Sequence, residues 1–175
     1  MKVILHTARL TLRPLCTGDV ETAYAYLGDR ENCLYMIFLP HDSKEETFDY
    51  LRKSEEEWQK ESPGYYDFAV LLDGEHIGEV FVYLSGSLGE LGWIIHRDHR
   101  GQGYALEAAE ALRDFALHKL KLKTLVAHCD ARNIASGRIM QKLGMSLHER
   151  GIRQNRAFPG VDAEEVGYIL ENGEI

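Results

Sequence analysis

The sequence predicts an α+β sandwich in which a mixed, mostly antiparallel sheet is flanked by helices. Two short apolar runs are joined by Asp73-Gly74, which is typical of a hairpin turn between antiparallel strands. Further on, a strand, a glycine-rich turn and a long amphipathic helix follow one another over residues 90–120. The antiparallel hairpins exclude the repeated strand–helix alternation of a parallel sheet. A chain of 175 residues fits one domain, and we expect that domain to span residues 1–175.

The first third of the chain predicts one strand and two helices. Polar and apolar residues alternate over residues 8–13, as in a half-buried strand. Apolar residues at helical spacing predict a short helix over residues 19–27 and a longer one over residues 43–61. The longer helix opens with Ser-Lys-Glu-Glu, the pattern of a capping box, in which a serine and a glutamate bond amides at the helix start. The side chains expected to point inward from it are Phe48, Leu51 and Trp58.

The rest of the chain predicts six strands and two helices. Glycine-containing turns separate the strands of the hairpins, and Gly144 lies where a helix is expected to end. The strand over residues 90–96 is apolar on both faces, which is typical of a central strand. The strands are expected at residues 66–72, 76–84, 90–96, 124–129, 145–153 and 165–170, and the helices at residues 101–120 and 133–143.

Composition and charge exclude several classes of function. The net charge of -8 argues against nucleic acid as the main partner, because phosphate binding requires a basic surface. No apolar run could span a bilayer and no signal-peptide pattern opens the chain, so we expect a cytoplasmic protein with no membrane partner. His96 and His99 have no carboxylate or cysteine to complete a metal set, so no metal is expected. Three scattered cysteines indicate reduced thiols: Cys16, Cys33 and Cys129.

A glycine-rich turn, Arg-Gly-Gln-Gly-Tyr-Ala at residues 100–105, connects the central strand to the long helix. The amides at a helix start have no intrahelical partner and carry a partial positive charge, which suits an anion. Gly101 and Gly103 allow the backbone to approach phosphate oxygens closely. These features indicate a pyrophosphate site, although a tight strand-to-helix turn that requires glycine explains the same residues. Leu106 stands where a dinucleotide-binding fingerprint has its third glycine, and the sequence contains no Walker loop.

Four segments together resemble the GNAT superfamily of N-acetyltransferases, and within it the RimJ/RimL branch. They are Glu-Leu-Gly-Trp-Ile-Ile at residues 90–95, the turn at residues 100–105, Asn-Ile-Ala-Ser at residues 133–136 and Lys-Leu-Gly-Met at residues 142–145. Residues 7–15 resemble the first strand of that branch, so the resemblance covers nearly the whole chain. It implies a GNAT fold, whose sheet is splayed around acetyl-CoA, and direct transfer of an acetyl group to a primary amine in a ternary complex.

The resemblance also implies how acetyl-CoA is held, with no metal involved. In such proteins the turn amides bind the pyrophosphate. The central strand, which usually carries a β-bulge, bonds the pantetheine arm and donates an N–H to the thioester carbonyl. Asn133 is expected to bond the pantetheine arm, and Ser136 to lie near the sulfur. The cofactor-binding residues are then Trp93, Ile94, Ile95, Arg100, Gly101, Gln102, Gly103, Tyr104, Ala105, Asn133 and Ser136.

Two catalytic residues are expected, an acid and a base. Many GNAT enzymes use a tyrosine as the acid at the position of Met140, which cannot donate a proton, so we expect Ser136 to replace it. Alternatively, the Ser136 hydroxyl bonds a carbonyl one helical turn back. Glu90, at the start of the central strand, is the first candidate for the base, and Glu79 on the neighbouring strand is the second. Glu90 could instead be solvated or paired with an arginine, and such enzymes can act without a dedicated base.

The acceptor is the part of the function that the sequence leaves open. The family shapes its acceptor pocket in the helix pair of residues 19–61, and we expect Tyr35, Phe38 and Tyr66 on the acceptor side. A protein N-terminus, a polyamine, an amino acid and an antibiotic amine all provide a primary amine, and the acidic chain favours cationic acceptors. A homodimer is common in similar proteins. The alternative function is a catalytically silent acyl-CoA-binding module, which Met140 would explain.

Overall fold

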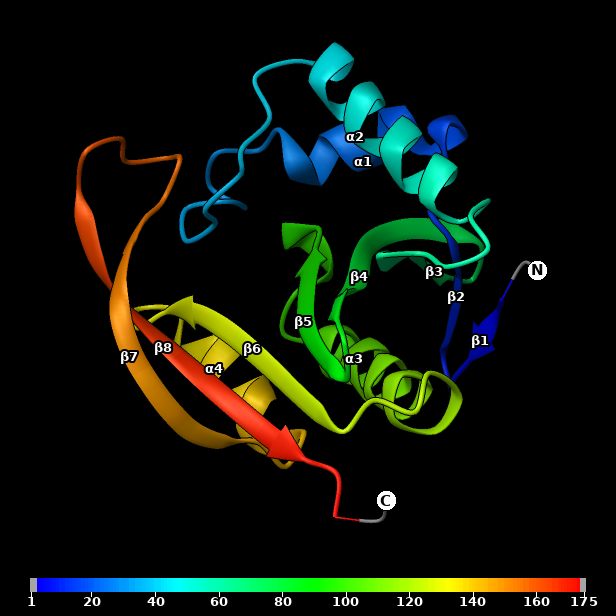
Figure 1. Ribbon diagram of the computed structural model, residues 1–175. Helices are drawn as coiled ribbons and strands as arrows, with labels where there is room; N and C mark the ends of the chain where they lie inside the picture. Colours follow the sequence, from blue (N-terminus) through cyan, green and yellow to red (C-terminus); the bar gives the residue numbers. More distant parts are fainter. Residues whose placement is uncertain (1–2, 174–175) are drawn as a thin grey trace.

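A computed structural model describes residues 3–173 and shows an eight-stranded sheet with the order β1-β2-β3-β4-β5-β6-β8-β7 (Figure 1). Neighbouring strands are antiparallel except β5 and β6, which are parallel. The strands are β1 (Leu5–His6), β2 (Leu10–Pro14), β3 (Tyr65–Leu72), β4 (Glu75–Ser85), β5 (Leu88–Ile95), β6 (Thr124–Asp130), β7 (Ser146–Gln154) and β8 (Asp162–Glu171). The helices are α1 (Val20–Leu27), α2 (Lys44–Glu57), α3 (Tyr104–Asp114) and α4 (Ile134–Lys142), with short helical turns at Thr17–Asp19, Arg97–His99 and Phe115–Lys119.

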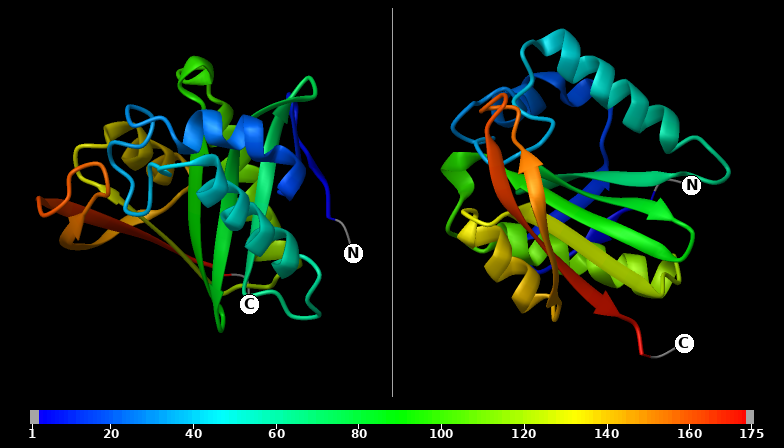
Figure 2. Two further views of the ribbon diagram at one scale, coloured as in Figure 1. Left: turned by 90° about the horizontal axis from the view of Figure 1, so that it is seen from above. Right: turned by 60° about the vertical axis from the view of Figure 1, so that its left-hand side comes forward.

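Helices cover both faces of the sheet (Figures 1 and 2). On one face, Leu27 of α1 and Leu51 of α2 join a buried cluster with Ala69 and Ile94 of the sheet. On the other face, α3 and α4 contribute to a larger core that includes Leu112 and buried side chains of β2 to β6. The predicted sandwich of helix, sheet and helix layers is confirmed.

The hairpin of β3 and β4 forms at the predicted turn. Asp73 and Gly74 have positive φ angles of 49° and 88°, as a two-residue hairpin turn of type I′ requires. An equally short turn joins β4 to β5 at Gly86, whose φ is 61°. β1 is a strand that the sequence pattern does not predict, because two residues are too few to show an alternation.

The parallel strands β5 and β6 separate soon after they begin. They pair only from Leu88 to Glu90 on β5 and from Thr124 to Val126 on β6. Beyond this point the two strands diverge, while β6 remains paired with β8 (Figure 1). The sheet is therefore splayed, and within the described residues the β5 edge that faces β6 has no partner strand beyond Glu90.

The β-bulge expected in the central strand does not cause this separation. Within the described residues, the register between β4 and β5 runs without a shift from Gly78 opposite Ile95 to Ser85 opposite Leu88. A register shift occurs one strand further away, between β3 and β4 next to Val70. The bulge expectation is wrong for this ladder: β5 stays with β4, and β6 turns away together with β8.

α2 is shorter than predicted and presents a different face to the sheet. It ends at Glu57 and not near residue 61. Ser43 caps it by accepting a hydrogen bond from the Glu46 amide at 3.2 Å, but the Glu46 carboxylate bonds an amide of the preceding loop, so the capping box stays half formed. Phe48 is 44% exposed, contrary to expectation, because the buried line of the helix lies one residue away. The side chains on that line are Thr47, Leu51 and Ser54.

The long helix predicted over residues 101–120 consists of two segments. α3 covers Tyr104–Asp114, and a π-helical turn, Phe115–Lys119, continues it. The first three predicted residues form the turn before the helix. Its predicted apolar face is buried at Ala108, Ala109 and Leu112. No helix in residues 3–173 is long and apolar enough to cross a bilayer.

Candidate active site

The separation of β5 from β6 opens a cavity of about 1240 Å³. The cofactor half is the part lined by residues 99–101 and 103–106 and by most of residues 132–142, which include α4; the expected cofactor residue Gln102 is not among the described residues that line it. We call the part lined by Leu27, by residues 31–41 and by side chains of α2, β4, β7 and β8 the acceptor half. Residues of β5 and β6 line the middle of the cavity, and one continuous space connects the two halves.

The turn before α3 presents free backbone amides to the cofactor half. Gly101 and Gly103 have φ angles of 75° and 84°, a conformation that other residues rarely adopt. α3 begins at Tyr104, and among the described contacts the amides of residues 101–106 have no hydrogen-bond partner in the protein. The start of a helix is the positive end of the helix dipole, and with its amides free it can hold an anion such as a pyrophosphate.

Arg9 and Glu107 support this turn, and sequence reasoning missed both. The Arg9 guanidinium donates to the Gln102 carbonyl at 3.0 Å and to the Glu107 carboxylate at 2.6 Å. It also lies over the Tyr104 ring, 4.6 Å from the centroid. Thr7 adds a hydrogen bond of 2.6 Å to Glu107. No local pattern could indicate these contacts, because 98 positions separate Arg9 from Glu107.

The two arginines beside the turn point away from it. The Arg100 guanidinium donates to the Asn32 carbonyl at 2.7 Å, and Arg97 pairs with Glu31 at 2.7 Å. Both partners belong to the segment between α1 and α2. Arg100 therefore connects the turn to the acceptor half, whereas the turn itself offers its backbone to an anion.

α4 lines the cofactor half with one polar cap and two cations. The side-chain oxygen of Asn133 caps the helix by accepting a hydrogen bond from the Ser136 amide at 3.2 Å, which explains the spacing Asn-x-x-Ser. Arg138 and Lys142 line the cavity further along α4. Among the described residues neither is in an ion pair. Lys142 belongs to one of the segments that resemble the family, but neither side chain is among the expected cofactor-binding residues. These two side chains can supply positive charge that Arg100 does not.

Ser136 and Met140 face the space between α4 and the strands. Trp93, Ile94 and Ile95 line the same space along the free edge of β5. No described contact joins the Ser136 hydroxyl to a carbonyl one turn back. Burial raises the pKa of the nearby Cys129 thiol, and a hydrogen bond with Ser136 partly offsets that effect.

The acceptor half contains two of the three aromatic residues expected there. Tyr35 and Phe38 line it, and Phe38 is 80% exposed at its rim. Tyr66 is not among the described residues that line the cavity, because it lies on the face of β3 that meets α3. Its ring packs against Trp58 and Phe115, with centroids 5.0 and 5.4 Å apart.

Glu90 is held in an ion pair at the point where β5 and β6 diverge. Its carboxylate accepts from His128 Nδ1 at 2.9 Å, and His128 Nε2 contacts Glu149 at the same distance. The hydrogen bond with Glu90 is the largest cause that raises the pKa of His128 to about 9. Glu90 is thus paired, as one alternative expected, but with a histidine instead of an arginine. Residues 3–173 contain no group of three or more histidine, cysteine, aspartate or glutamate side chains that could bind a metal.

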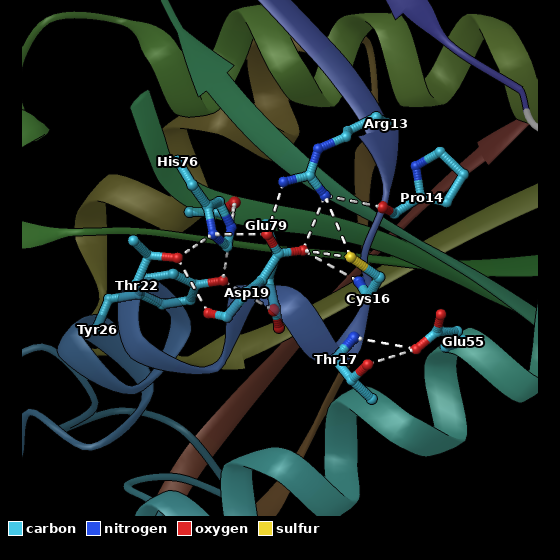
Figure 3. A network of polar contacts seen from close by, with 11 residues as sticks. Arg13, Pro14, Cys16, Thr17, Asp19, Thr22, Tyr26, Glu55, His76 and Glu79 are labelled. Carbon is cyan, nitrogen blue, oxygen red and sulfur yellow. Dashed lines mark hydrogen bonds and ion pairs between the residues drawn. The ribbon is translucent and has the colours of Figure 1, made fainter. Parts of the chain in front are cut away.

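Glu79 is the buried carboxyl group of the acceptor half. It is 2% exposed, and its two oxygens accept hydrogen bonds from Tyr26 at 3.0 Å and Tyr50 at 2.9 Å. Tyr26 also contacts His76 at 3.3 Å, so a polar network extends from Glu79 towards α1 and β2 (Figure 3). Burial raises the pKa of Glu79 to about 7, and the two tyrosines partly oppose that shift. A carboxyl group with such a pKa can accept a proton near neutral pH.

A family pattern described as an acetyltransferase (GNAT) domain matches residues 9–146 of this chain. The chain belongs to the GNAT acetyltransferase family. This GNAT acetyltransferase is 28% identical over 146 residues to the uncharacterized N-acetyltransferase YnaD of Bacillus subtilis, an alignment that covers 79% of this chain and 80% of YnaD.

Solved structures share the fold of this GNAT acetyltransferase. RimL, a ribosomal L7/L12 alpha-N-protein acetyltransferase solved with coenzyme A, superposes with a TM-score of 0.83 at 16% identity, covering 97% of this chain and 98% of RimL. Spermidine N-acetyltransferase from Vibrio cholerae, solved with CoA and spermine, gives a TM-score of 0.80 at 18% identity over 94% of this chain and 96% of that one. The splayed sheet of this acetyltransferase is therefore the GNAT fold.

Proposed function

We propose that this GNAT acetyltransferase transfers the acetyl group of acetyl-CoA to a primary amine by direct attack in a ternary complex. One observation carries the proposal: free amides at the start of α3 and a buried carboxyl group, Glu79, line the same continuous cavity. The first feature suits a pyrophosphate and the second suits an amine that must lose a proton. A thioester held along β5 would lie between them.

The cofactor half has the groups that acetyl-CoA requires. The amides of residues 101–105 would bind the pyrophosphate, and Arg138 and Lys142 add charge for phosphate groups. The pantetheine arm contains amides that can pair with the free edge of β5, as an added strand would. Asn133 remains a candidate for the same arm through the part of its side chain that does not cap α4.

Glu79 is our assignment for the base, in place of Glu90. The Glu90 carboxylate is already engaged in an ion pair with His128, whose pKa that contact raises to about 9. Glu79 has only neutral tyrosine partners and a pKa near 7. It would remove the proton of the ammonium group, and the neutral amine would then attack the thioester carbonyl.

The remaining steps need a hydrogen-bond donor to the oxyanion and an acid that protonates the leaving thiolate. As the amine nitrogen bonds the carbonyl carbon, an N–H on the free edge of β5 would stabilise the oxyanion. When the carbon–sulfur bond breaks, the thiolate of CoA takes a proton from Ser136, the candidate donor, and the serine regains one from the nitrogen that has attacked, which still carries an extra proton. Met140, which is 1% exposed and lines the cavity, cannot replace it.

Two measurements test this proposal. Acetyl-CoA should raise the melting temperature of the protein, whereas NAD and ATP should not. Release of the CoA thiol should depend on an added amine, with the acetylated amine detected by mass spectrometry. Stabilisation by acetyl-CoA without amine-dependent thiol release would instead indicate a silent acyl-CoA-binding module, the alternative that Met140 suggests. No stabilisation and no thiol release would contradict both functions.

A further inference from the structure

The charged side chains that line the acceptor half are almost all neutralised by an opposite charge. A paired charge in a cavity offers little to a charged ligand, because its partner cancels most of its field. Three carboxylates of the cavity wall are paired in this way. The pairs are Glu31 with Arg97, Glu90 with His128 and Glu165 with Arg153, at 2.7, 2.9 and 3.0 Å.

Glu79 is the exception among the described residues that line this half. Its partners, Tyr26 and Tyr50, donate hydrogen bonds but carry no charge. Each carboxylate oxygen can accept a further hydrogen bond. Asn32 provides a second acceptor: it is 6% exposed, it lines the cavity, and its side-chain oxygen has no partner. Glu79 and Asn32 thus both offer acceptor atoms, and a primary ammonium group is made only of donors.

Most of the remaining surface of the acceptor half is apolar. Leu27, Leu34, Met36 and Leu39 line it from the α1 side, and Phe38 lies at the rim. Phe81 of β4 covers the backbone of β5. Its ring lies so close to Gly92 that a Cβ there would come within 2.0 Å of it. The sheet side of this half thus presents an aromatic surface next to Glu79, two residues away on the same face of β4.

We infer that the acceptor is a small amine with one ammonium group on an apolar body, and that polyamines and peptide N-termini are poor acceptors. The inference rests on the proposed function and names its substrate class. A second ammonium group would enter this half without an unpaired carboxylate to receive it, which is costly. A peptide would bring an N–H and a C=O next to its amine; Asn32 could accept from the N–H, but the apolar wall would leave the C=O without a partner.

Three acceptors distinguish the classes. We would measure kcat/KM at saturating acetyl-CoA for 2-phenylethylamine, spermidine and a tripeptide that begins with serine. The inference expects 2-phenylethylamine to exceed each of the others by at least about tenfold, since one uncompensated polar or charged group costs this much or more. A higher kcat/KM for spermidine or for the tripeptide would overturn it.

A matched pair of variants tests the role of the apolar wall. Phe38→Ser should lower kcat/KM for 2-phenylethylamine about tenfold while leaving that for ethylamine, which has no phenyl ring to contact Phe38, within about twofold. Phe48→Ser removes a half-exposed phenylalanine of α2 that does not line the cavity in the described structure, and it should change neither value. Equal losses for both amines in Phe38→Ser would contradict the assignment of the rim.

Failure of the inference can be told from failure of the proposed function. Efficient transfer to spermidine or the peptide contradicts the inference about the acceptor but agrees with the proposed acetyl transfer. Binding of acetyl-CoA without transfer to any of the three amines overturns the inference and favours the silent module. Absence of both binding and transfer overturns the proposed function itself.

Discussion

The two halves of the cavity are built in different ways. The cofactor half combines free backbone amides at the start of α3 with side chains of α4, and two continuous segments of the chain supply both. The acceptor half consists of side chains from several separate segments, and its central carboxyl group is held by tyrosines of α1 and α2. Changes to single side chains should therefore alter the recognition of the amine strongly and the binding of acetyl-CoA more weakly.

Replacing Glu79 should produce the largest effect. Glu79→Gln keeps the size of the side chain and removes its ability to take a proton. We expect kcat to fall about a thousandfold, as for the loss of a general base, while the Kd for acetyl-CoA stays unchanged. In the wild type, kcat should rise as the pH passes about 7, because the base acts only when ionised. Glu56→Gln, at an exposed position of α2, is the matched control.

The same variant should make the protein more stable at high pH. The pKa of Glu79 is about 7 in the folded protein, compared with an ordinary value of 4.5 for a glutamate side chain. The stability that comes from the neutral form is complete below pH 4.5 and is lost as the pH rises through about 7. At pH 8, Glu79→Gln should therefore raise the free energy of unfolding by up to about 3 kcal/mol. Lower activity together with lower stability at pH 8 would indicate that Glu79 is structural.

Removing the Ser136 hydroxyl should have the next largest effect. Ser136→Ala should lower kcat about a hundredfold if the serine protonates the leaving thiolate. Its amide still bonds Asn133, so α4 keeps its cap and acetyl-CoA binding should persist. With an acetyl donor whose leaving thiol is more acidic than that of CoA, Ser136→Ala should recover most of the rate. Unchanged kcat with intact cofactor binding would remove Ser136 from the mechanism.

The same contrast explains how much the sequence could predict. The fold, the hairpin at Asp73-Gly74 and the glycine turn before α3 depend on neighbouring residues, so local patterns indicate them. Glu79 needs Tyr26 and Tyr50, which lie 53 and 29 positions away, and only the folded chain shows that Glu79 is buried between them. Tyr66 was misplaced because β3 presents alternate residues to opposite faces, and sequence alone does not say which face meets the acceptor.

Loss of Arg9 should have a moderate effect confined to the cofactor half. Arg9→Ala removes the hydrogen bond to the Gln102 carbonyl and the ion pair with Glu107, so the turn before α3 becomes less ordered. We expect the Kd for acetyl-CoA to rise about fivefold to tenfold, the equivalent of one hydrogen bond to a charged group. The ratio of kcat/KM values between amines should not change. Arg52→Ala, which breaks only exposed ion pairs on α2, should leave the Kd unchanged.

Replacing His128 should produce the smallest effect. Its side chain pairs with Glu90 where β5 and β6 diverge, between the two halves of the cavity. The pKa of His128 is about 9 in the folded protein, compared with an ordinary value of 6.5 for a histidine side chain. Its contribution to stability is complete below pH 6.5 and is lost as the pH rises through about 9. The melting temperature of the wild type should therefore fall over this window more than that of His128→Gln, by a few degrees at most because the pair is partly exposed. His148→Gln, an exposed histidine of β7, should follow the wild type.

The same His128 variant also changes the charge of the acceptor half. Without the imidazolium, Glu90 becomes a second carboxylate with no cationic partner. A diamine or polyamine could then place one ammonium group at Glu79 and another at Glu90. Relative to 2-phenylethylamine, kcat/KM for spermidine should rise a few-fold in His128→Gln and stay constant in His148→Gln. An unchanged ratio would mean that the pairing of Glu90 does not decide which amines are accepted.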